Sequence, residues 1–283
     1  GEVKITRKIN SLDVIIRSCT SIKMLTQNKE RVFEKEKVDY TLRSIKSLIK
    51  SIIEAKKFFG NIDFKIMVVD HNSSTSNLKK IEELFALHDL DFKLINLDVN
   101  EYKDQIAEIN QEKKKVTTNQ ISNMSNINKS LDLSKNSSDL IYFVEDDYIH
   151  KSDSLAEMLF AYEKFASIFK DEVFILSTDY PYLYKKMNNS NILIGEKTHW
   201  RTVNESLLTF MTSRKMVEKY FEKLIDMATN WSDPFEKNLH EIYEKEKCFS
   251  PMPSLSVHCA NINSVFGLSP NINWKQLWEE NKS

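Results

Sequence analysis

The stretch that decides the fold is Leu140-Ile141-Tyr142-Phe143-Val144, followed at once by Glu145-Asp146-Asp147. Five apolar residues in a row predict a buried strand, and the three acids stand where that strand leaves its sheet. Ionised carboxylates are costly in an apolar core, so acids at this place require a cation, a partner or solvent. Oxygen ligands of this kind suit a hard divalent metal that bridges a diphosphate. The alternative is that these acids cap the next helix or simply meet water.

Strands and helices alternate along the first two thirds of the chain. Alternating elements of this kind predict a three-layer α/β/α sandwich with a mostly parallel sheet. Residues 100–118 are very polar and have no clear period, which predicts a mobile or extended insert. Repeats, low-complexity linkers and domain boundaries are all lacking, so residues 1–283 are predicted to form one domain. The predicted strands are 12–16, 64–70, 92–97, 139–144 and 173–176, and the predicted helices are 40–57, 77–87, 119–134 and 152–169.

Composition excludes several classes of function. The 40 Lys and Arg residues nearly balance the 41 Asp and Glu residues, whereas nucleic-acid binders usually carry a strong basic excess. Only 4 glycines occur, and neither a dinucleotide-binding Gly-x-Gly-x-x-Gly nor a phosphate-binding Walker loop can be built from them. The sequence therefore predicts no nucleic-acid partner and disfavours dinucleotide enzymes and P-loop kinases.

The cysteines and the apolar runs of the sequence indicate in which cellular compartment the protein is expected. The three cysteines, Cys19, Cys248 and Cys259, form no Cys-x-x-Cys pair, so a disulfide framework and a thiolate zinc site are not expected. This pattern fits a reducing compartment and predicts a cytoplasmic location. No run of 18 uninterrupted apolar residues occurs, and the first residues lack the apolar core of a signal peptide.

Polar residues follow three of the predicted strands. These segments are Arg17-Ser18-Cys19-Thr20, Asp70-His71-Asn72 and Glu145-Asp146-Asp147. In a parallel sheet the three strand ends face the same way, and ligands bind outside the carboxyl ends of such strands. The sequence therefore predicts one crevice, suited to a nucleotide diphosphate with a divalent metal.

Three segments resemble the nucleotide-sugar-binding core of GT-A-fold glycosyltransferases. They are Val14-Ile15-Ile16-Arg17-Ser18-Cys19-Thr20, Ile66-Met67-Val68-Val69-Asp70-His71-Asn72-Ser73-Ser74 and Ile141-Tyr142-Phe143-Val144-Glu145-Asp146-Asp147-Tyr148. The resemblance covers about residues 12–216 and extends toward the C-terminus through 254–258 and 268–274. It implies a Rossmann-like GT-A fold, with a nucleotide-binding half over about 12–150 and an acceptor-binding half over about 151–283.

The same resemblance implies roles for matching positions. Glu145-Asp146-Asp147 is similar to the Asp-x-Asp motif, with Glu in the first place, and Asp147 is the implied metal ligand. His258 is similar to a late metal-binding histidine, and its imidazole suits Mn²⁺ better than Mg²⁺; structural use of a lone histidine is the alternative. Asp70 is the implied contact to the uracil or ribose of the donor, or else a helix cap. The implied nucleotide-sugar-binding set is Arg17, Ser18, Thr20, Asp70, Asn72, Glu145, Asp146 and Arg201, in which Arg201 offers a planar fork to phosphate.

An inverting sugar transfer needs a base that deprotonates the acceptor hydroxyl. The preferred candidate is Asp233, with Glu236 as the alternative and Asp179, after the fifth predicted strand, as a further acceptor-site acid. The competing interpretation is purely structural. Asp233-Pro234 is also a good helix N-cap followed by Pro at the first position, and Glu236 would complete a capping box.

The resemblance thus implies a metal-dependent, hexosyltransferase-type enzyme of polysaccharide biosynthesis. It would use Mn²⁺ or Mg²⁺ to move a sugar from a UDP-linked donor to a glycan or lipid-linked acceptor, with inversion, although a retaining mechanism stays open. The alternatives are a sugar-phosphate nucleotidyltransferase, and a non-catalytic carbohydrate-binding protein that kept the fold. The Lys-rich face of helix 40–57 allows a peripheral contact with anionic lipid head groups.

Overall fold

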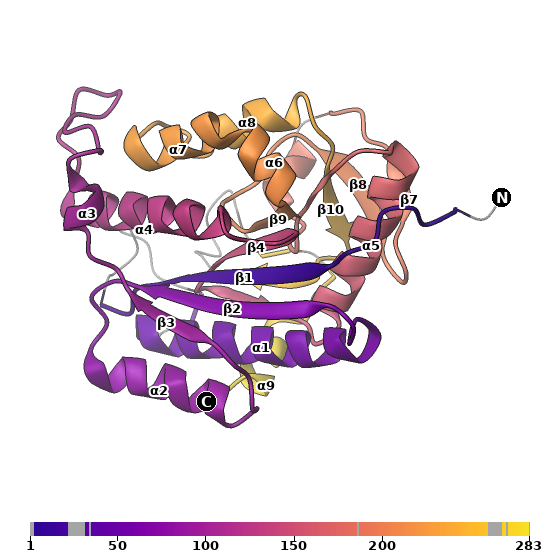
Figure 1. Ribbon diagram of the computed structural model, residues 1–283, viewed down its shortest axis with the longest axis horizontal. Helices are drawn as coiled ribbons and strands as arrows, with labels where there is room; N and C mark the ends of the chain where they lie inside the picture. The colour runs from indigo at the N-terminus through magenta and orange to yellow at the C-terminus, as the bar shows by residue number, and fades with distance from the viewer. Residues whose placement is uncertain are drawn as a thin grey trace.

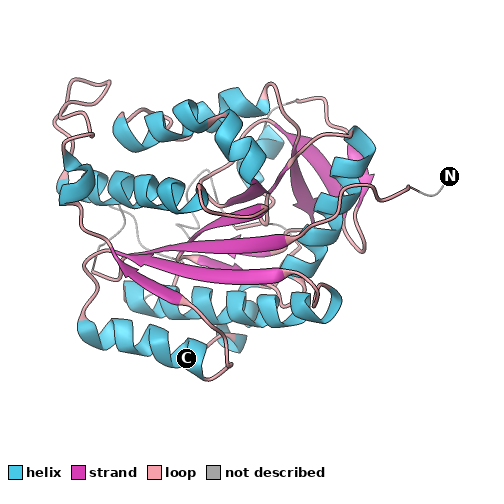
Figure 2. Ribbon diagram, viewed as in Figure 1, coloured by secondary structure: helices cyan, strands magenta, loops and turns pink. Residues whose placement is uncertain are grey.

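The structure is a computed structural model that describes residues 3–21, 32–33, 35–185, 187–259, 268–269 and 271–282. Within these residues, a large sheet carries helices on both faces, as Figure 1 and Figure 2 show. The strands are β1 (Ser11–Ser18), β2 (Asp63–Asp70), β3 (Lys93–Asn96), β4 (Leu140–Glu145), β5 (Tyr148–His150), β6 (Phe174–Ile175), β7 (Ile192–Ile194), β8 (His199–Val203), β9 (Phe210–Ser213), β10 (Cys248–Met252) and β11 (Ser256–His258). The helices are α1 (Lys37–Phe58), α2 (Thr75–Ala86), α3 (Asn100–Lys103), α4 (Thr118–Ser134), α5 (Ser154–Phe169), α6 (Arg214–Lys219), α7 (Phe221–Thr229), α8 (Lys237–Tyr243), α9 (Trp274–Glu280) and the 3₁₀ helix η1 (Pro181–Lys185).

The large sheet has the strand order β3-β2-β1-β4-β9-β6-β10-β8-β7 among the described residues. Neighbouring strands from β3 to β4 are parallel, as are β6 and β10, whereas β9 and β8 run against their neighbours. Seven of these nine strands therefore point the same way, which confirms the predicted α/β class with a mostly parallel sheet. A second, two-stranded sheet pairs β5 with β11.

The central strands are apolar throughout because both of their faces are covered. In β4, Leu140, Tyr142 and Val144 pack with α1, α2 and α5 on one face of the sheet. Ile141 and Phe143 point to the other face and join the core formed with α4, α6, α7 and α8. Side chains of a strand alternate between faces, so a run without polar residues is what a two-sided core requires.

The five strands and four helices predicted from the sequence are confirmed, with ends that shift by one to three residues. Strands β5 and β7 to β11 are additional, and each is only three to five residues long. Runs this short carry no readable hydrophobic period.

Residues 100–118, for which the sequence predicts a mobile or extended insert, contain a little regular structure. This segment contains α3 and an isolated bridge between Ile109 and Lys115. Its backbone is also tied to the end of α7, since Ala107 N donates to Thr229 O at 2.8 Å. The polar sequence therefore reflects an exposed but hydrogen-bonded loop rather than an unstructured one.

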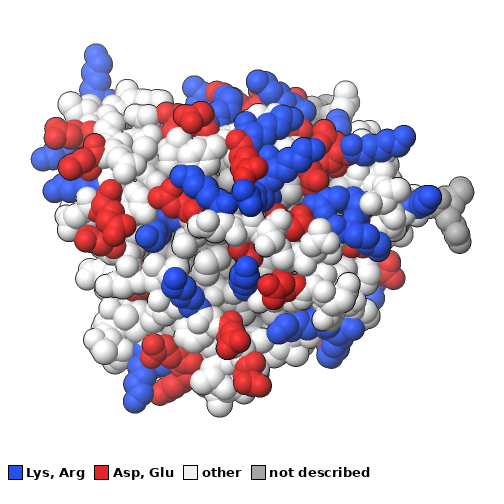
Figure 3. Space-filling view, in the orientation of Figure 1, with Lys and Arg blue, Asp and Glu red and all other residues white. Residues whose placement is uncertain are grey.

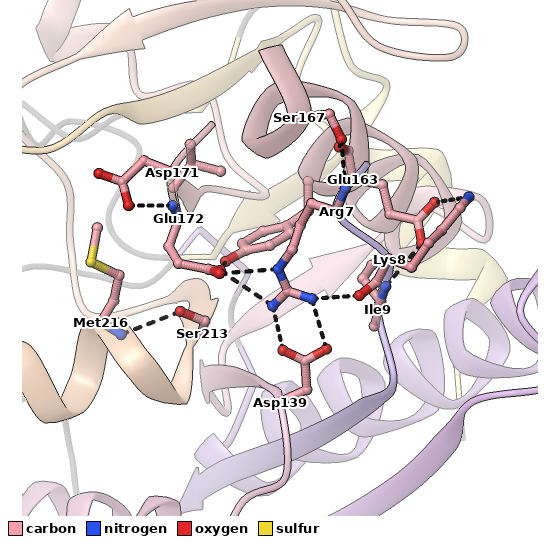
Figure 4. A network of polar contacts seen from close by, with 12 residues as sticks. Arg7, Lys8, Ile9, Asp139, Glu163, Ser167, Asp171, Glu172, Ser213 and Met216 are labelled. Atoms are coloured by element: carbon pink, nitrogen blue, oxygen red, sulfur yellow. Dashed lines mark hydrogen bonds and ion pairs between the residues drawn. The ribbon is translucent and has the colours of Figure 1, made fainter. Parts of the chain in front are cut away.

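A polar clasp fixes the N-terminal segment at the sheet edge where β4 begins. Figure 4 shows the Arg7 guanidinium between the carboxylates of Asp139 and Glu172, and Arg7 Nη1 lies 3.1 Å from Asp139 Oδ2. Ser167 Oγ on α5 accepts hydrogen bonds from the backbone N–H groups of Thr6 and Arg7, both at 2.9 Å. This edge is opposite to the carboxyl ends of the parallel strands, so the clasp stabilises the fold away from the predicted crevice.

The surface carries both signs of charge. On the face drawn in Figure 3, Lys and Arg side chains alternate with Asp and Glu side chains. Among the helices of the described residues, none combines the length and the apolar character needed to cross a membrane. Part of the Lys-rich face of α1 is used internally, because Lys46 Nζ and Lys50 Nζ donate to backbone carbonyls of Lys282 and Glu280 beside α9.

Candidate functional site

Three strand ends meet at one edge of the sheet. Ser18 at the end of β1 is in register with Asp70 at the end of β2, and Arg17 is in register with Glu145 at the end of β4. All three strands are parallel, so the prediction that these ends lie together is confirmed. The polar residues that follow them begin a crevice on this side of the molecule.

A pocket of about 710 Å³ opens at this edge. Its walls come from the ends of β1 and β4, the first turns of α1 and α4, the loop before α4, and the connection between α7 and α8. Among the predicted site residues, those that line it are Arg17, Ser18, Glu145, Asp146, Asp147, Asp233, Glu236 and His258.

Buried Arg17 and half-buried Glu145 form an ion pair in the lining of the pocket. Arg17 Nη2 lies 3.0 Å from Glu145 Oε1, and Arg17 Nη1 donates to Asn123 Oδ1 on α4 at 3.1 Å. Burial raises the pKa of the Glu145 carboxyl above its usual range, although the Arg17 guanidinium acts in the opposite direction. Arg17 is therefore held rigidly, with part of its charge already offset.

Asp146 holds the neighbouring loops in place. Its Oδ2 accepts hydrogen bonds from Thr41 Oγ1 at 2.7 Å and from Cys19 N at 3.3 Å, and its Oδ1 pairs with Lys37. Lys37 and Thr41 lie in the first two turns of α1, near the helix N-terminus, where a carboxylate is favoured by the helix dipole. These contacts give Asp146 a role in supporting the loops, besides the nucleotide-sugar contact that the resemblance implies.

Asp147 and His258 lie side by side in the pocket wall. Pairing of β5 with β11 sets His258 opposite Tyr148, which follows Asp147 directly, and the two rings stack at 4.4 Å. His258 Nε2 then lies 3.4 Å from Asp147 Oδ2. Burial lowers the pKa of His258, but the charges of Asp147 and Glu145 outweigh that effect and raise it overall.

The Asp147–His258 pair fits a divalent metal that arrives with its substrate. Within the described residues, no group of three or more His, Cys, Asp and Glu side chains is arranged to hold a metal by itself. Two atoms that bind one metal at about 2.1 Å lie roughly 3–3.4 Å apart, as Asp147 Oδ2 and His258 Nε2 do. Metals bound together with phosphates need only one or two protein ligands, because phosphate oxygens and waters complete the shell.

Acidic side chains outnumber basic ones in the lining of the pocket. Six carboxylates and four Lys or Arg side chains line it. Three of these basic groups already have acidic partners: Arg17 with Glu145, Lys37 with Asp146 and Lys114 with Glu112. A bound cation would offset the remaining negative charge.

Glu236 and Asp233 reach the same pocket but differ in environment. Asp233 is exposed, whereas the Glu236 side chain is partly buried at the N-cap of α8. Burial, reinforced by the nearby Glu145, raises the pKa of Glu236 to about 7. The structural interpretation of this segment as an Asp233 cap with a capping box is wrong, because α8 begins at Lys237 and its N-cap, Glu236, makes no side-chain capping bond.

Three predicted donor contacts from the β1 and β2 loops lie outside the pocket lining. Asp70 is 1% exposed, and its carboxylate accepts hydrogen bonds from Ser73 N at 3.1 Å and Ser73 Oγ at 2.6 Å. Thr20 Oγ1 accepts a hydrogen bond from Asn77 Nδ2 at 3.0 Å, which ties the loop after β1 to the first turn of α2. Asn72 is exposed with a φ of 62°, in the left-handed region that Asn tolerates.

Asp179 and Arg201 are also elsewhere, and they pair with each other. Arg201 Nη2 lies 3.0 Å from Asp179 Oδ1, and the guanidinium stacks 4.0 Å above the ring of Tyr184. Ser250 Oγ donates to the same Asp179 oxygen at 3.3 Å. Asp179 and Arg201 thus form an ion pair with each other, and neither residue lines the pocket.

Other pocket residues were not singled out from the sequence. Lys37 and Tyr40 belong to the start of α1, and Trp231 and Phe235 form an aromatic pair with ring centres 4.7 Å apart. Loop residues such as Lys115 come from the segment predicted to be an insert. No local pattern distinguishes them, since each is brought to the pocket by contacts between distant parts of the chain.

We expect Asp70→Ala to lower stability rather than nucleotide affinity. Removing the carboxylate leaves Ser73 N and Ser73 Oγ without their acceptor, at a cost of about 1–3 kcal/mol. Thermal unfolding and calorimetric titration with UDP and Mn²⁺ would measure both effects. If the variant were as stable as the wild type but bound UDP more weakly, the prediction would be wrong, and the donor contact implied by the family resemblance would be supported instead.

No protein-family model and no curated protein matches the sequence. Similar solved structures include the UTP-bound UGPase from Acinetobacter baumannii, at 10% identity and a TM-score of 0.46, over 96% of this chain and 92% of that one. Mouse xyloside xylosyltransferase 1 in its apo form shows 11% identity and a TM-score of 0.45, over 84% and 83%. The galactosyltransferase LgtC, in complex with donor and acceptor sugar analogues, shows 9% identity and a TM-score of 0.38, over 83% and 70%. Likenesses of this size assign no family and no activity to the chain.

Proposed function

We propose that this protein is a metal-dependent glycosyltransferase that moves a sugar from a UDP-linked donor to a hydroxyl group of a glycan or lipid-linked acceptor, with inversion. The observation that carries the proposal is the composition of one pocket. Asp147 and His258 line it at the carboxyl edge of the parallel strands, and Asp233 and Glu236 line it from the connection before α8. The pocket thus holds a candidate metal-binding pair and a candidate base together.

The donor would lie along the strand ends. A divalent metal held by Asp147 and His258 would offset charge on the leaving diphosphate. Arg17, fixed by Glu145 and Asn123, presents a guanidinium to the same pocket, and the face of Trp231 or Phe235 offers an apolar surface for a sugar ring.

Glu236 is the preferred base in this structure. A pKa of about 7 makes the Glu236 carboxylate a stronger base than an ordinary carboxylate, while about half of it is still ionised near neutral pH. As the acceptor oxygen bonds to the anomeric carbon, its proton passes to the carboxylate. The bond from that carbon to the phosphate oxygen breaks, and the nucleoside diphosphate leaves with the electron pair.

Thermal unfolding with a panel of nucleotide sugars, with and without Mn²⁺, tests the donor. We expect UDP-sugars to raise the melting temperature only when Mn²⁺ is present, since a ligand that binds the folded state stabilises it. Other nucleotides and Mn²⁺ alone serve as controls. Equal stabilisation by all nucleotides, or none by any, would contradict the proposal.

Product analysis separates the proposed activity from its alternatives. A glycosyltransferase releases UDP from the donor and forms a glycoside when a glycan acceptor is added. A sugar-phosphate nucleotidyltransferase instead forms UTP from a UDP-sugar and pyrophosphate. A carbohydrate-binding protein that kept the fold would bind the donor but would form neither a glycoside nor UTP.

A further inference from the structure

The imidazole of His258 lies flat against the ring of Tyr148. β5 and β11 pair antiparallel with His258 directly opposite Tyr148, so both side chains leave the two-stranded sheet on the same face. Their ring centres are 4.4 Å apart and their planes differ by 9°, which makes a face-to-face stack. His258 lines the pocket, whereas Tyr148 is fully buried and does not. Tyr148 therefore acts on the pocket through the histidine rather than by touching a ligand.

His258 lacks the hydrogen bond that usually orients a metal-binding histidine. Such a histidine normally donates its second ring N–H to a carboxylate, a carbonyl oxygen or a water, which fixes the orientation of the ring. In His258, Nε2 lies 3.4 Å from Asp147 Oδ2, and Nδ1 is buried without a hydrogen-bond partner among the described residues. The stack on Tyr148 takes the place of that bond, because tilting the imidazole would break the contact between the two ring faces.

Tyr148 is itself held firmly. Its hydroxyl lies 2.7 Å from the hydroxyl of Tyr180, and its backbone oxygen accepts a hydrogen bond from Ser44 Oγ on α1 at 2.7 Å. Burial raises the pKa of both phenols, so each keeps its proton and one hydroxyl donates to the other. A buried ring that is bonded at its tip and at its backbone offers the histidine a surface of fixed orientation.

The backbone on both sides of His258 is also fixed. Before it, Ser256 N donates to Ser177 O, in the segment after β6, at 2.9 Å. After it, Cys259 N donates to Asp147 O at 2.8 Å. With its backbone held in this way, the freedom that remains to His258 is rotation of its side chain, and the stack restricts that rotation.

We propose that Tyr148 is a positioning residue whose ring, anchored by the Tyr180 hydroxyl, fixes the plane of the His258 imidazole and keeps Nε2 beside Asp147 for the metal. The proposal rests on the proposed function, which assigns His258 to a divalent metal. Tyr148 contributes to metal affinity, and to turnover only through that affinity. The part of Tyr148 that orients the histidine is its aromatic face, which phenylalanine shares and leucine lacks.

The stack can be measured in the metal-free protein. Protons that lie over the face of an aromatic ring are shielded, so NMR with ¹³C-labelled histidine should show the His258 ring protons upfield of those of exposed His199. His258→Gln identifies the resonance among the six histidines. Tyr148→Phe should keep the upfield position, and Tyr148→Leu should lose it.

Binding of UDP with Mn²⁺ measures what the stack does for the metal. Calorimetric titration is carried out well below the melting temperature of each variant. Tyr148→Leu, and Tyr148→Met with its flexible apolar side chain, should lower the Mn²⁺-dependent affinity about 10–100-fold, as loss of a group that supports a metal ligand does. Tyr148→Phe should stay within about threefold of wild type, although its melting temperature should fall because the Tyr180 hydroxyl loses its buried partner.

Phe165→Leu is the matched control, because Phe165 is another fully buried aromatic residue, on α5, and packs against Phe249 with ring centres 4.7 Å apart. It should lower the melting temperature without changing the Mn²⁺-dependent affinity. An equal loss of affinity in Phe165→Leu or in Tyr148→Phe would overturn the inference, because the effect would then not depend on the aromatic face.

The inference is also overturned if the wild-type His258 protons are not shifted upfield, or if folded Tyr148→Leu and Tyr148→Met keep full affinity. If the wild-type protein shows no Mn²⁺-dependent UDP binding, the proposed function fails. In that case the ring-proton shifts of the metal-free protein still decide whether Tyr148 orients His258, so the two failures give different results.

Discussion

Asp147→Ala should abolish Mn²⁺-dependent UDP binding while the protein stays folded. Asp147 and His258 are the two donor side chains that fit the metal, with Oδ2 and Nε2 3.4 Å apart. Loss of an outer-shell partner alone costs 10–100-fold in metal affinity, so loss of a direct ligand should exceed about 100-fold. Calorimetric titration with UDP, in Mn²⁺ and in EDTA, measures the effect. The affinity that remains in EDTA should be the same in wild type and variant.

Asp146→Ala provides the matched comparison, because it removes the adjacent acid of the same motif. Asp146 accepts hydrogen bonds from Cys19 N and Thr41 Oγ1 and pairs with Lys37. Its loss removes an ion pair and leaves Cys19 N and Thr41 Oγ1 without their acceptor, at a cost of about 1–3 kcal/mol. We therefore expect a lower melting temperature for Asp146→Ala. If Asp147→Ala folds normally and keeps its Mn²⁺-dependent affinity, the metal assignment is wrong.

The fold and the edge that carries the pocket could be predicted because they depend on local pattern. A run such as Leu140 to Val144, with no polar residue, suits only a strand covered on both faces. Glu145 to Asp147 then mark where that strand meets the pocket. Since parallel strands end at one edge, three such ends were enough to place the crevice.

The different roles of the acids that lie near strand ends could not be predicted from that pattern. Asp70, Asp147 and Asp179 all follow strands and look alike in the sequence. Their surroundings in the structure differ. The Asp70 carboxylate accepts a hydrogen bond from Ser73, and Asp179 forms an ion pair with Arg201. Of the three acids, Asp147 alone lies beside a histidine, His258. The last contact depends on pairing between β5 and β11, more than a hundred residues apart.

In the region before α8, too, the local sequence did not predict the structure. Asp233, Pro234 and Glu236 have the spacing of a helix start, yet α8 begins only at Lys237. Packing against the pocket, rather than capping, decides how these side chains lie. Glu236 becomes partly buried and Asp233 stays exposed, and this difference is why we propose Glu236 rather than Asp233 as the base.

Glu236→Gln should lower turnover by roughly 10²–10⁴, with donor binding retained, because it removes the base and little else. A base works when ionised, and burial raises the pKa of Glu236 to about 7. Wild-type kcat/KM should therefore rise with pH up to about 7 and level off above it. In Glu236→Gln that rise should be lost, whereas Asp233→Asn should keep both the profile and near-normal turnover.

Stability gives an independent measurement of the same carboxyl. The folded protein holds the Glu236 proton more tightly than the unfolded chain does, with a pKa of about 7 against an ordinary value of 4.5. The folded state thus binds more protons between these values, and stability must fall as pH rises from about 4.5 through about 7. Glu236→Gln should flatten that part of the stability profile. A flat wild-type profile, or a turnover loss confined to Asp233→Asn, would move the base from Glu236 to Asp233.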